Sequence, residues 1–396
     1  MSSTTRRTVT RSTVTRRTAR ALAVATAAAA ATALLTVPAL AAAPQHAGGE
    51  VPGSGAPVFV QSDNTAGNTV IAYHRNADGT LSQAGSYATG GLGGVLAGSA
   101  VDHLASEGSL VLDQRHQLLY AVNAASDTVT VFAVHGDRLR RVQVVSSGGE
   151  FPVSVAVHGN LVYVANALDG GSIQGFARVG DRLVRIPSWH RDLNLDPSAT
   201  PQFTHTPGQI GFTPDGSELI VTTKAAANTI DVFPLSGSGA PASEPVVTST
   251  PGAVPFGFAF DPAGRLQVTE AGPNAVATFT VGRHGALTAV GQLATGQAAT
   301  CWITATGDHL YASNAGSGSL SGFGAAAPGA LTPLGATATD GGTVDAAASS
   351  DGHYLYAQTG AKGVVDEFRV ARDGSLTAIG SVTVPGAVGG EGIAAG

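Results

Sequence analysis

Short runs in which apolar and polar residues alternate recur along the chain from residue 58 onward. In Thr128–Phe132 and Thr229–Phe233 this alternation indicates β-strands with one buried face. Runs such as Leu161–Val164 are apolar throughout and predict strands buried on both faces. Glycine-containing turns such as Asp351–Gly352 separate the runs, and glycine tolerates the positive φ of tight hairpins. The pattern contains no long amphipathic helix and predicts an all-β protein.

The strand pattern repeats at a nearly constant interval. An aromatic residue ends the alternating strand of each repeat: Tyr73, Phe132, Phe176, Phe233, Phe279, Phe323 and Phe368. Four of the six spacings between them are 44 to 46 residues, which is the length of a four-stranded β-propeller blade. The other two spacings are 59 and 57 residues, and they place insertions at roughly 88–107 and 187–206.

The two ends of the repeat region complement each other. Glu391–Gly396 resembles an innermost strand with no blade after it, and Val58–Val60 resembles a second strand with no innermost strand before it. If the two segments pair, they complete blade one and remove an exposed strand edge. Innermost strands near residues 109, 154, 209, 257, 301, 345 and 391 then make seven blades. The sequence therefore predicts a single-domain, seven-bladed β-propeller of four-stranded antiparallel blades over residues 58–396, closed in blade one.

The first 43 residues have a different composition. They contain six arginines, no acidic residue, the apolar run Ala21–Leu35 and a small-residue stretch ending at Ala43, which together predict a secretory signal peptide. Residues 44–57 are expected to form a flexible linker. The apolar run is shorter than the roughly 20 residues of a membrane span, so no span is expected in the mature chain. We expect a secreted, extracellular protein, and Arg16–Arg17 keeps the twin-arginine route open beside the Sec route.

Charge and cysteine content narrow the function classes. Removing the predicted leader moves the formal net charge from −6 to −12, which argues against binding to nucleic acid. Cys301 is the only cysteine, so no intrachain disulfide can form. The sequence has no residue spacing typical of a zinc or calcium site and no phosphate-binding loop. We therefore expect no metal and no cofactor. The expected partner is a small molecule, and the expected oligomeric state is a monomer.

One face of the predicted ring should carry the function. In an antiparallel meander, the loops between strands two and three lie on the same face as the crossovers between blades, where both insertions also lie. Long loops on a rigid scaffold often carry binding groups. The candidate substrate-binding residues on this face are Asn123, Asn166 and Asn314 from the loops, and Glu150, Gln209 and Glu391 from the crossovers. The structural alternatives are turn capping for the asparagines and solvated rim positions for the acids.

Three residues on the same face are catalytic candidates. His205, at the end of the second insertion, is the candidate general base for water, because histidine accepts a proton near neutral pH. Lys224, or a backbone amide, is the candidate that stabilises an oxyanion. Glu270 comes from the next blade, and an ion pair between Lys224 and Glu270 is the alternative reading that we favour for that lysine. The alternative for His205 is a local hydrogen bond in a loop.

Two segments, Ile210–Thr222 and Leu310–Asn314, resemble the lactonase family of seven-bladed propellers, which includes proteins of the 6-phosphogluconolactonase and carboxymuconate cyclase types. The resemblance extends over Val58–Gly396. It implies the propeller fold and ring-opening chemistry by His, Arg and Glu near the channel.

The chain departs from that family at the residues expected to act. Several innermost strands of the enzymes begin with Pro-Arg-His, whereas the matching segments here are Pro152–Ser154, Pro207–Gln209 and Pro255–Gly257. Two hypotheses follow. One is an exported hydrolase of a small lactone, or a related lyase or cyclase, and the other is a non-catalytic secreted binding or scaffold propeller.

Overall fold

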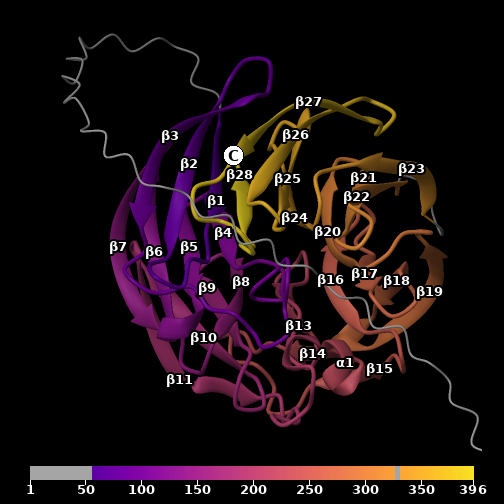
Figure 1. Ribbon diagram of the computed structural model, residues 1–396. Coiled ribbons are helices and arrows are strands. Elements are labelled where there is room, and N and C mark those ends of the chain that lie inside the picture. The colour runs from indigo at the N-terminus through magenta and orange to yellow at the C-terminus, as the bar shows by residue number, and fades with distance from the viewer. Residues whose placement is uncertain (1–55, 326–330) are drawn as a thin grey trace, which may run out of the picture. The chain divides into compact units, whose positions relative to one another are not determined.

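The computed structural model describes residues 56–325 and 331–396, which form seven four-stranded antiparallel sheets arranged in a ring (Figure 1). The predicted all-β, seven-bladed propeller is confirmed. The predicted signal peptide and nearly all of the predicted linker lie outside the described residues. No helix among the residues described here is long and apolar enough to cross a bilayer.

The strands follow the chain blade by blade. Blade one contains β28 (Ile393–Ala395), β1 (Pro57–Gln61), β2 (Thr69–Arg75) and β3 (Leu81–Ala88), and blade two contains β4 (Leu110–Asp113), β5 (Leu118–Asn123), β6 (Thr128–His135) and β7 (Arg138–Ser146). Blade three contains β8 (Pro152–His158), β9 (Leu161–Asn166), β10 (Ser172–Val179) and β11 (Arg182–Asp192), and blade four contains β12 (Ile210–Phe212), β13 (Glu218–Thr222), β14 (Thr229–Pro234) and β15 (Val246–Ser249). Blade five contains β16 (Pro255–Phe260), β17 (Leu266–Glu270), β18 (Ala275–Val281) and β19 (Leu287–Ala294), and blade six contains β20 (Thr300–Thr306), β21 (His309–Asn314), β22 (Ser319–Gly324) and β23 (Thr332–Ala338). Blade seven contains β24 (Thr343–Ala348), β25 (Tyr354–Thr359), β26 (Val364–Val370) and β27 (Leu376–Thr383). The helical turns are η1 (Ala124–Ser126), η2 (Gln202–Thr204), α1 (Lys224–Ala227) and η3 (Arg283–Gly285).

The ring closes within blade one, as the sequence predicts. Val58 pairs with Ala395 and Val60 pairs with Ile393, so the last strand lies antiparallel beside the first. The first strands of the blades follow in the order β28, β4, β8, β12, β16, β20 and β24. All neighbouring pairs except β12 and β16 have close contacts, and β16 contacts β13 of blade four, so these strands surround the axis.

The aromatic residues of the repeat form the core between blades. All seven predicted closing aromatics lie on the third strand of their blade and are buried. In five blades a β-bulge directly precedes this residue, as between Val131 and Phe132. Tyrosines on the second strands also join neighbouring blades: the Tyr163 hydroxyl donates to the Gly239 carbonyl (2.6 Å), and the Tyr356 hydroxyl donates to the Gly79 carbonyl (2.8 Å) across the closing interface.

The second insertion begins later than predicted. Strand β11 continues to Asp192, whereas the sequence placed the insertion from Pro187. The reason is an irregularity in the pairing of β10 with β11. Gln174 pairs with His190 but Phe176 pairs with Arg185, so β11 carries extra residues at this point. The extra residues of β11 place Trp189 in a stack on Tyr163, with ring centroids 6.0 Å apart, so burial of an aromatic ring lengthens the strand.

Candidate functional site

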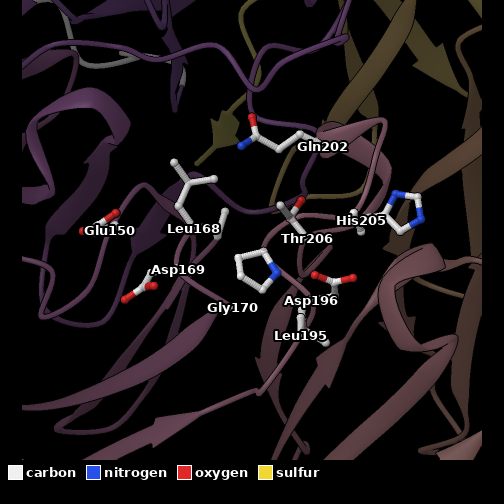
Figure 2. A pocket seen from close by; sticks show the side chains of 12 residues that line it. Glu150, Leu168, Asp169, Gly170, Leu195, Asp196, Gln202, His205 and Thr206 are labelled. Carbon is white, nitrogen blue, oxygen red and sulfur yellow. The ribbon is translucent and has the colours of Figure 1, made fainter.

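A polar pocket of about 300 Å³ lies where the second insertion meets blade three. Figure 2 shows Glu150 and Asp169 on one side of this pocket, and Asp196 and His205 on the opposite side. Glu150 precedes β8 and Asp169 follows β9, so these two residues come from the crossover and from the loop between strands two and three. The structure thus places two of the predicted residues, Glu150 and His205, at one pocket, which we call the His205 pocket.

The hydrogen bonds of His205 determine which ring nitrogen is free. Its Nδ1 lies 2.8 Å from the Pro201 carbonyl oxygen and 2.9 Å from the Thr204 hydroxyl. A carbonyl oxygen only accepts, so the proton resides on Nδ1 and leaves Nε2 as the basic nitrogen. Nearby Asp196 accepts hydrogen bonds from Ser198, and these bonds, with a smaller contribution from His205, hold the pKa of its carboxyl below the usual range. Among these groups the unprotonated Nε2 is the one suited to accept a proton from water.

Lys224 lies outside the His205 pocket and contacts both insertions. Its buried ammonium donates to the carbonyl of Ala105 in the first insertion (2.5 Å) and to that of Phe203 in the second (2.7 Å). Burial lowers its pKa to about 7, against the attraction of Asp102. The predicted ion pair between Lys224 and Glu270 is therefore wrong, because the two carbonyls bind this ammonium instead.

Glu270 occupies a third location. It is buried at the end of β17, where its carboxylate accepts a hydrogen bond from the Gln292 side chain, and burial raises its pKa. It borders a different pocket, together with Pro251. The structure does not bring Glu270, Lys224 and His205 to one cavity.

The predicted asparagines and glutamine bind within the protein. Asn123 donates to the Thr130 hydroxyl (2.9 Å) and so joins the second and third strands of blade two. Equivalent bonds lead from Asn166 to Ser172 (3.3 Å) in blade three and from Asn314 to Ser321 (3.0 Å) in blade six, and the Gln209 side chain accepts the Phe258 amide of blade five. The bonds of the three asparagines support the structural alternative for them, and substrate binding by all four residues stays a prediction.

The first insertion fills the centre of the ring. Its Ser106 hydroxyl donates to the Val153 carbonyl of blade three (2.9 Å), and its Ser106 carbonyl accepts the Trp302 indole N–H of blade six (2.6 Å). The Gly108 amide donates to Glu391 of blade one (3.1 Å). Because one short loop binds innermost strands on opposite sides of the axis, residues 101–108 form a plug in the channel. The sequence predicted only that this insertion would lie on the same face as the crossovers.

Five buried carboxyl groups lie in the plug or around it: Asp102 and Glu107 within it, and Asp63, Asp345 and Glu391 from the blades. Glu107 accepts the Ile303 amide (3.2 Å), and Asp345 accepts the Ile393 amide (3.1 Å). Of these acids the sequence analysis identified only Glu391. Asp102 and Glu107 lie in a non-repeating insertion, and no sequence periodicity could position them; the signal available was their charge within a segment of small and apolar residues.

Burial raises the pKa of all five acids. The pKa of Asp63 and of Asp102 rises to about 7, and that of Asp345 rises to about 6. The pKa values of Glu107 and Glu391 rise well above the usual range, through burial and through the neighbouring Asp345. At mildly acidic pH the carboxyl groups of this cluster are therefore protonated, neutral and able to form hydrogen bonds.

Comparison with known proteins supports both the family resemblance and the propeller fold. The family model for the lactonase, seven-bladed β-propeller, matches residues 58–182 and 267–390, which is more than half of the chain. This chain belongs to the lactonase family. The resemblance predicted from its repeat segments is confirmed. A search of curated proteins found no match.

Several solved structures are similar to this lactonase-family chain over most of their length. A protein from Lactobacillus plantarum is 20% identical, with 85% of this chain and 98% of that chain covered and a TM-score of 0.69. A putative 6-phosphogluconolactonase from Bacteroides fragilis is 19% identical, with 87% and 99% covered and a TM-score of 0.68. The periplasmic gluconolactonase of Pseudomonas aeruginosa is 16% identical, with 85% and 98% covered and a TM-score of 0.68. At these identities the likeness concerns the fold.

Proposed function

We propose that this lactonase-family propeller is an exported enzyme that hydrolyses a small cyclic ester in the His205 pocket. The observation that carries the proposal is that His205, whose Nε2 is the basic nitrogen, lines a pocket on the face that holds both insertions. Family membership supports ring-opening chemistry, and the arginine-rich start with its apolar run supports export.

The proposed reaction needs one proton carrier. His205 Nε2 accepts a proton from water as the water oxygen attacks the lactone carbonyl, and a backbone amide of the pocket stabilises the oxyanion. The ring C–O bond then breaks, and the imidazolium returns its proton to the departing alkoxide, which leaves a hydroxy acid. Lys224 is not assigned the oxyanion, because its ammonium already donates to two carbonyls.

A second candidate function is non-catalytic ligand binding. The observation that favours it is the plug, since residues 101–108 fill the channel in which the family's chemistry is expected to occur.

Lactone hydrolysis distinguishes the two functions. We expect purified mature protein to release acid from at least one member of a panel of aldonolactones and aliphatic lactones, measured by titration at constant pH. Replacing His205 with alanine should lower the rate by roughly 100-fold or more. The control is His190→Ala, because His190 lies on β11 outside the pocket and bonds Asp192. A rate no higher than that of buffer, or an unchanged rate in His205→Ala, would refute catalysis by this route.

A further inference from the structure

A second cavity, of about 180 Å³, lies beside the plug and outside the His205 pocket. Its walls come from separate parts of the chain: Val101 from the first insertion, Phe203 from the second, Phe256 from β16, and Cys301 and Trp302 from β20. Gly98 and Ala100 also line it and are exposed, so they form its opening to solvent.

Aromatic rings form the deeper part of this cavity. The rings of Phe256 and Trp302 have centroids 5.0 Å apart and planes inclined at 60°, which makes an apolar corner. Both side chains are buried, whereas Val101 and Phe203 are only partly buried. A ligand between them would remove apolar surface from water, which is the main favourable contribution to binding of an uncharged hydrocarbon group.

The polar groups around the cavity already have partners. The Asp102 carboxyl oxygens accept the amides of Leu104 (2.8 Å) and Ser106 (2.9 Å) within the plug. The Trp302 indole N–H donates to the Ser106 carbonyl, and burial raises the pKa of the Cys301 thiol to about 12, which keeps it uncharged.

The cation that lies over the Phe256 ring is also engaged. The Lys224 ammonium lies 5.2 Å from the centroid of the Phe256 ring and donates to two carbonyls. A charged or polyhydroxylated ligand would lose its hydration here without gaining equivalent hydrogen bonds, which is unfavourable.

We propose that this cavity binds a small uncharged ligand through one six-membered hydrocarbon ring. The volume fits this class, because an apolar protein cavity of roughly 150 Å³ accommodates benzene. The proposal is independent of hydrolysis in the His205 pocket, since it concerns different side chains and binding alone.

Trp302 provides a direct measurement of binding. The chain has two tryptophans, and Trp189→Phe leaves Trp302 as the only one. We expect cyclohexanol to change the Trp302 emission in a saturable manner, and we expect glucono-δ-lactone at the same concentration to leave it unchanged. If Trp189→Phe does not fold, wild-type emission compared with that of Trp302→Phe gives the same information.

A pair of matched variants tests the location. Ala315 lines the cavity, and its amide donates to the Ala299 carbonyl (3.0 Å); Ala271 has the equivalent bond to Val254 (3.1 Å) one blade earlier and does not line it. Ala315→Leu should weaken cyclohexanol binding by about tenfold or more, because the added side chain fills the cavity. Ala271→Leu should retain the binding.

Three outcomes would overturn the proposal: no saturable change with cyclohexanol, equal binding of glucono-δ-lactone, or equal weakening by both leucine variants. His205→Ala should leave cyclohexanol binding unchanged while it removes any lactone hydrolysis. Failure of the cavity proposal and failure of the proposed hydrolysis are thus seen separately.

Discussion

At the scale of single residues, the buried acids in and around the plug have raised pKa values. Asp63 accepts the Glu391 amide on one carboxyl oxygen (2.8 Å) and the Gln61 side-chain amide on the other. The Gln61 side-chain oxygen has no partner in this arrangement. Both hydrogen bonds to Asp63 favour the carboxylate, but burial is the larger effect and raises the pKa of this acid to about 7.

We predict that Asp63 makes the protein less stable as pH rises from about 4 to 7. The unfolded chain loses this proton near pH 4, whereas the folded chain keeps it until the pKa of about 7, so the stabilisation is complete at low pH and is lost through this window. We therefore expect the Tm of the wild type to fall between pH 5 and pH 8. We expect a smaller fall for Asp63→Asn. Asparagine also tolerates the positive φ of 50° at this position.

Thermal unfolding followed by circular dichroism at several pH values measures this difference. Asp78→Asn is the control, because Asp78 is an exposed turn residue whose pKa is held low by Thr80. The same pH slope in wild type and Asp63→Asn would contradict the prediction.

At the scale of elements, the two insertions are joined to each other and to the ring. The Gln202 side chain accepts the Ala97 amide (2.9 Å), and the Gly208 carbonyl accepts the Glu107 amide (3.0 Å). Lys224, at the start of α1, adds one bond to each insertion. The plug, the His205 pocket and the apolar cavity therefore share the same loops.

We predict that Lys224→Met loosens the insertions and leaves the seven sheets intact. Methionine keeps much of the side-chain volume but leaves the Ala105 and Phe203 carbonyls without a donor. Each unpaired buried carbonyl costs about 1–3 kcal/mol of stability. This cost is partly offset because the variant no longer buries a charge. Hydrogen exchange of amides in residues 101–108 should become about tenfold faster, while exchange in the blades stays unchanged. Lys362→Met, at an exposed lysine, is the control, and unchanged exchange in the plug would refute the prediction.

At the scale of the whole molecule, stability depends on closure of the ring. Closure rests on the β28–β1 pairing within blade one. Between blades seven and one it is supported by the bond from Tyr356 to Gly79 and the bond from the Leu81 amide to Glu367 (3.0 Å). Every sheet except the one in blade one is formed from a single continuous segment.

We predict that removing residues 391–396 lowers Tm strongly and promotes aggregation. The truncation exposes the inner edge of β1, and unpaired strand edges bind one another. Differential scanning calorimetry and light scattering measure the two effects. Glu391→Gln in the full-length chain is the control, because it removes the acid and keeps the strand. Unchanged melting of the truncated protein would show that β28 is not required for closure.

The sequence by itself determined the blades, because each strand carries its own signal in an alternation of two residues and each repeat ends in an aromatic such as Phe132. It also indicated the closure, since Val58–Val60 and Glu391–Gly396 are each incomplete without the other. It placed Glu150 and His205 on the functional face, where they border one pocket, although their roles remain predictions.

Only the tertiary structure decided what the insertions do. The ammonium of Lys224 is bound by a carbonyl 119 positions away, and Glu391 binds an amide 283 positions away, so no local pattern could reveal either partner. The length of β11 likewise depends on stacking between Trp189 and Tyr163 rather than on alternation. Loops without a repeat are positioned by the partners they contact, and those partners are known only once the ring has formed.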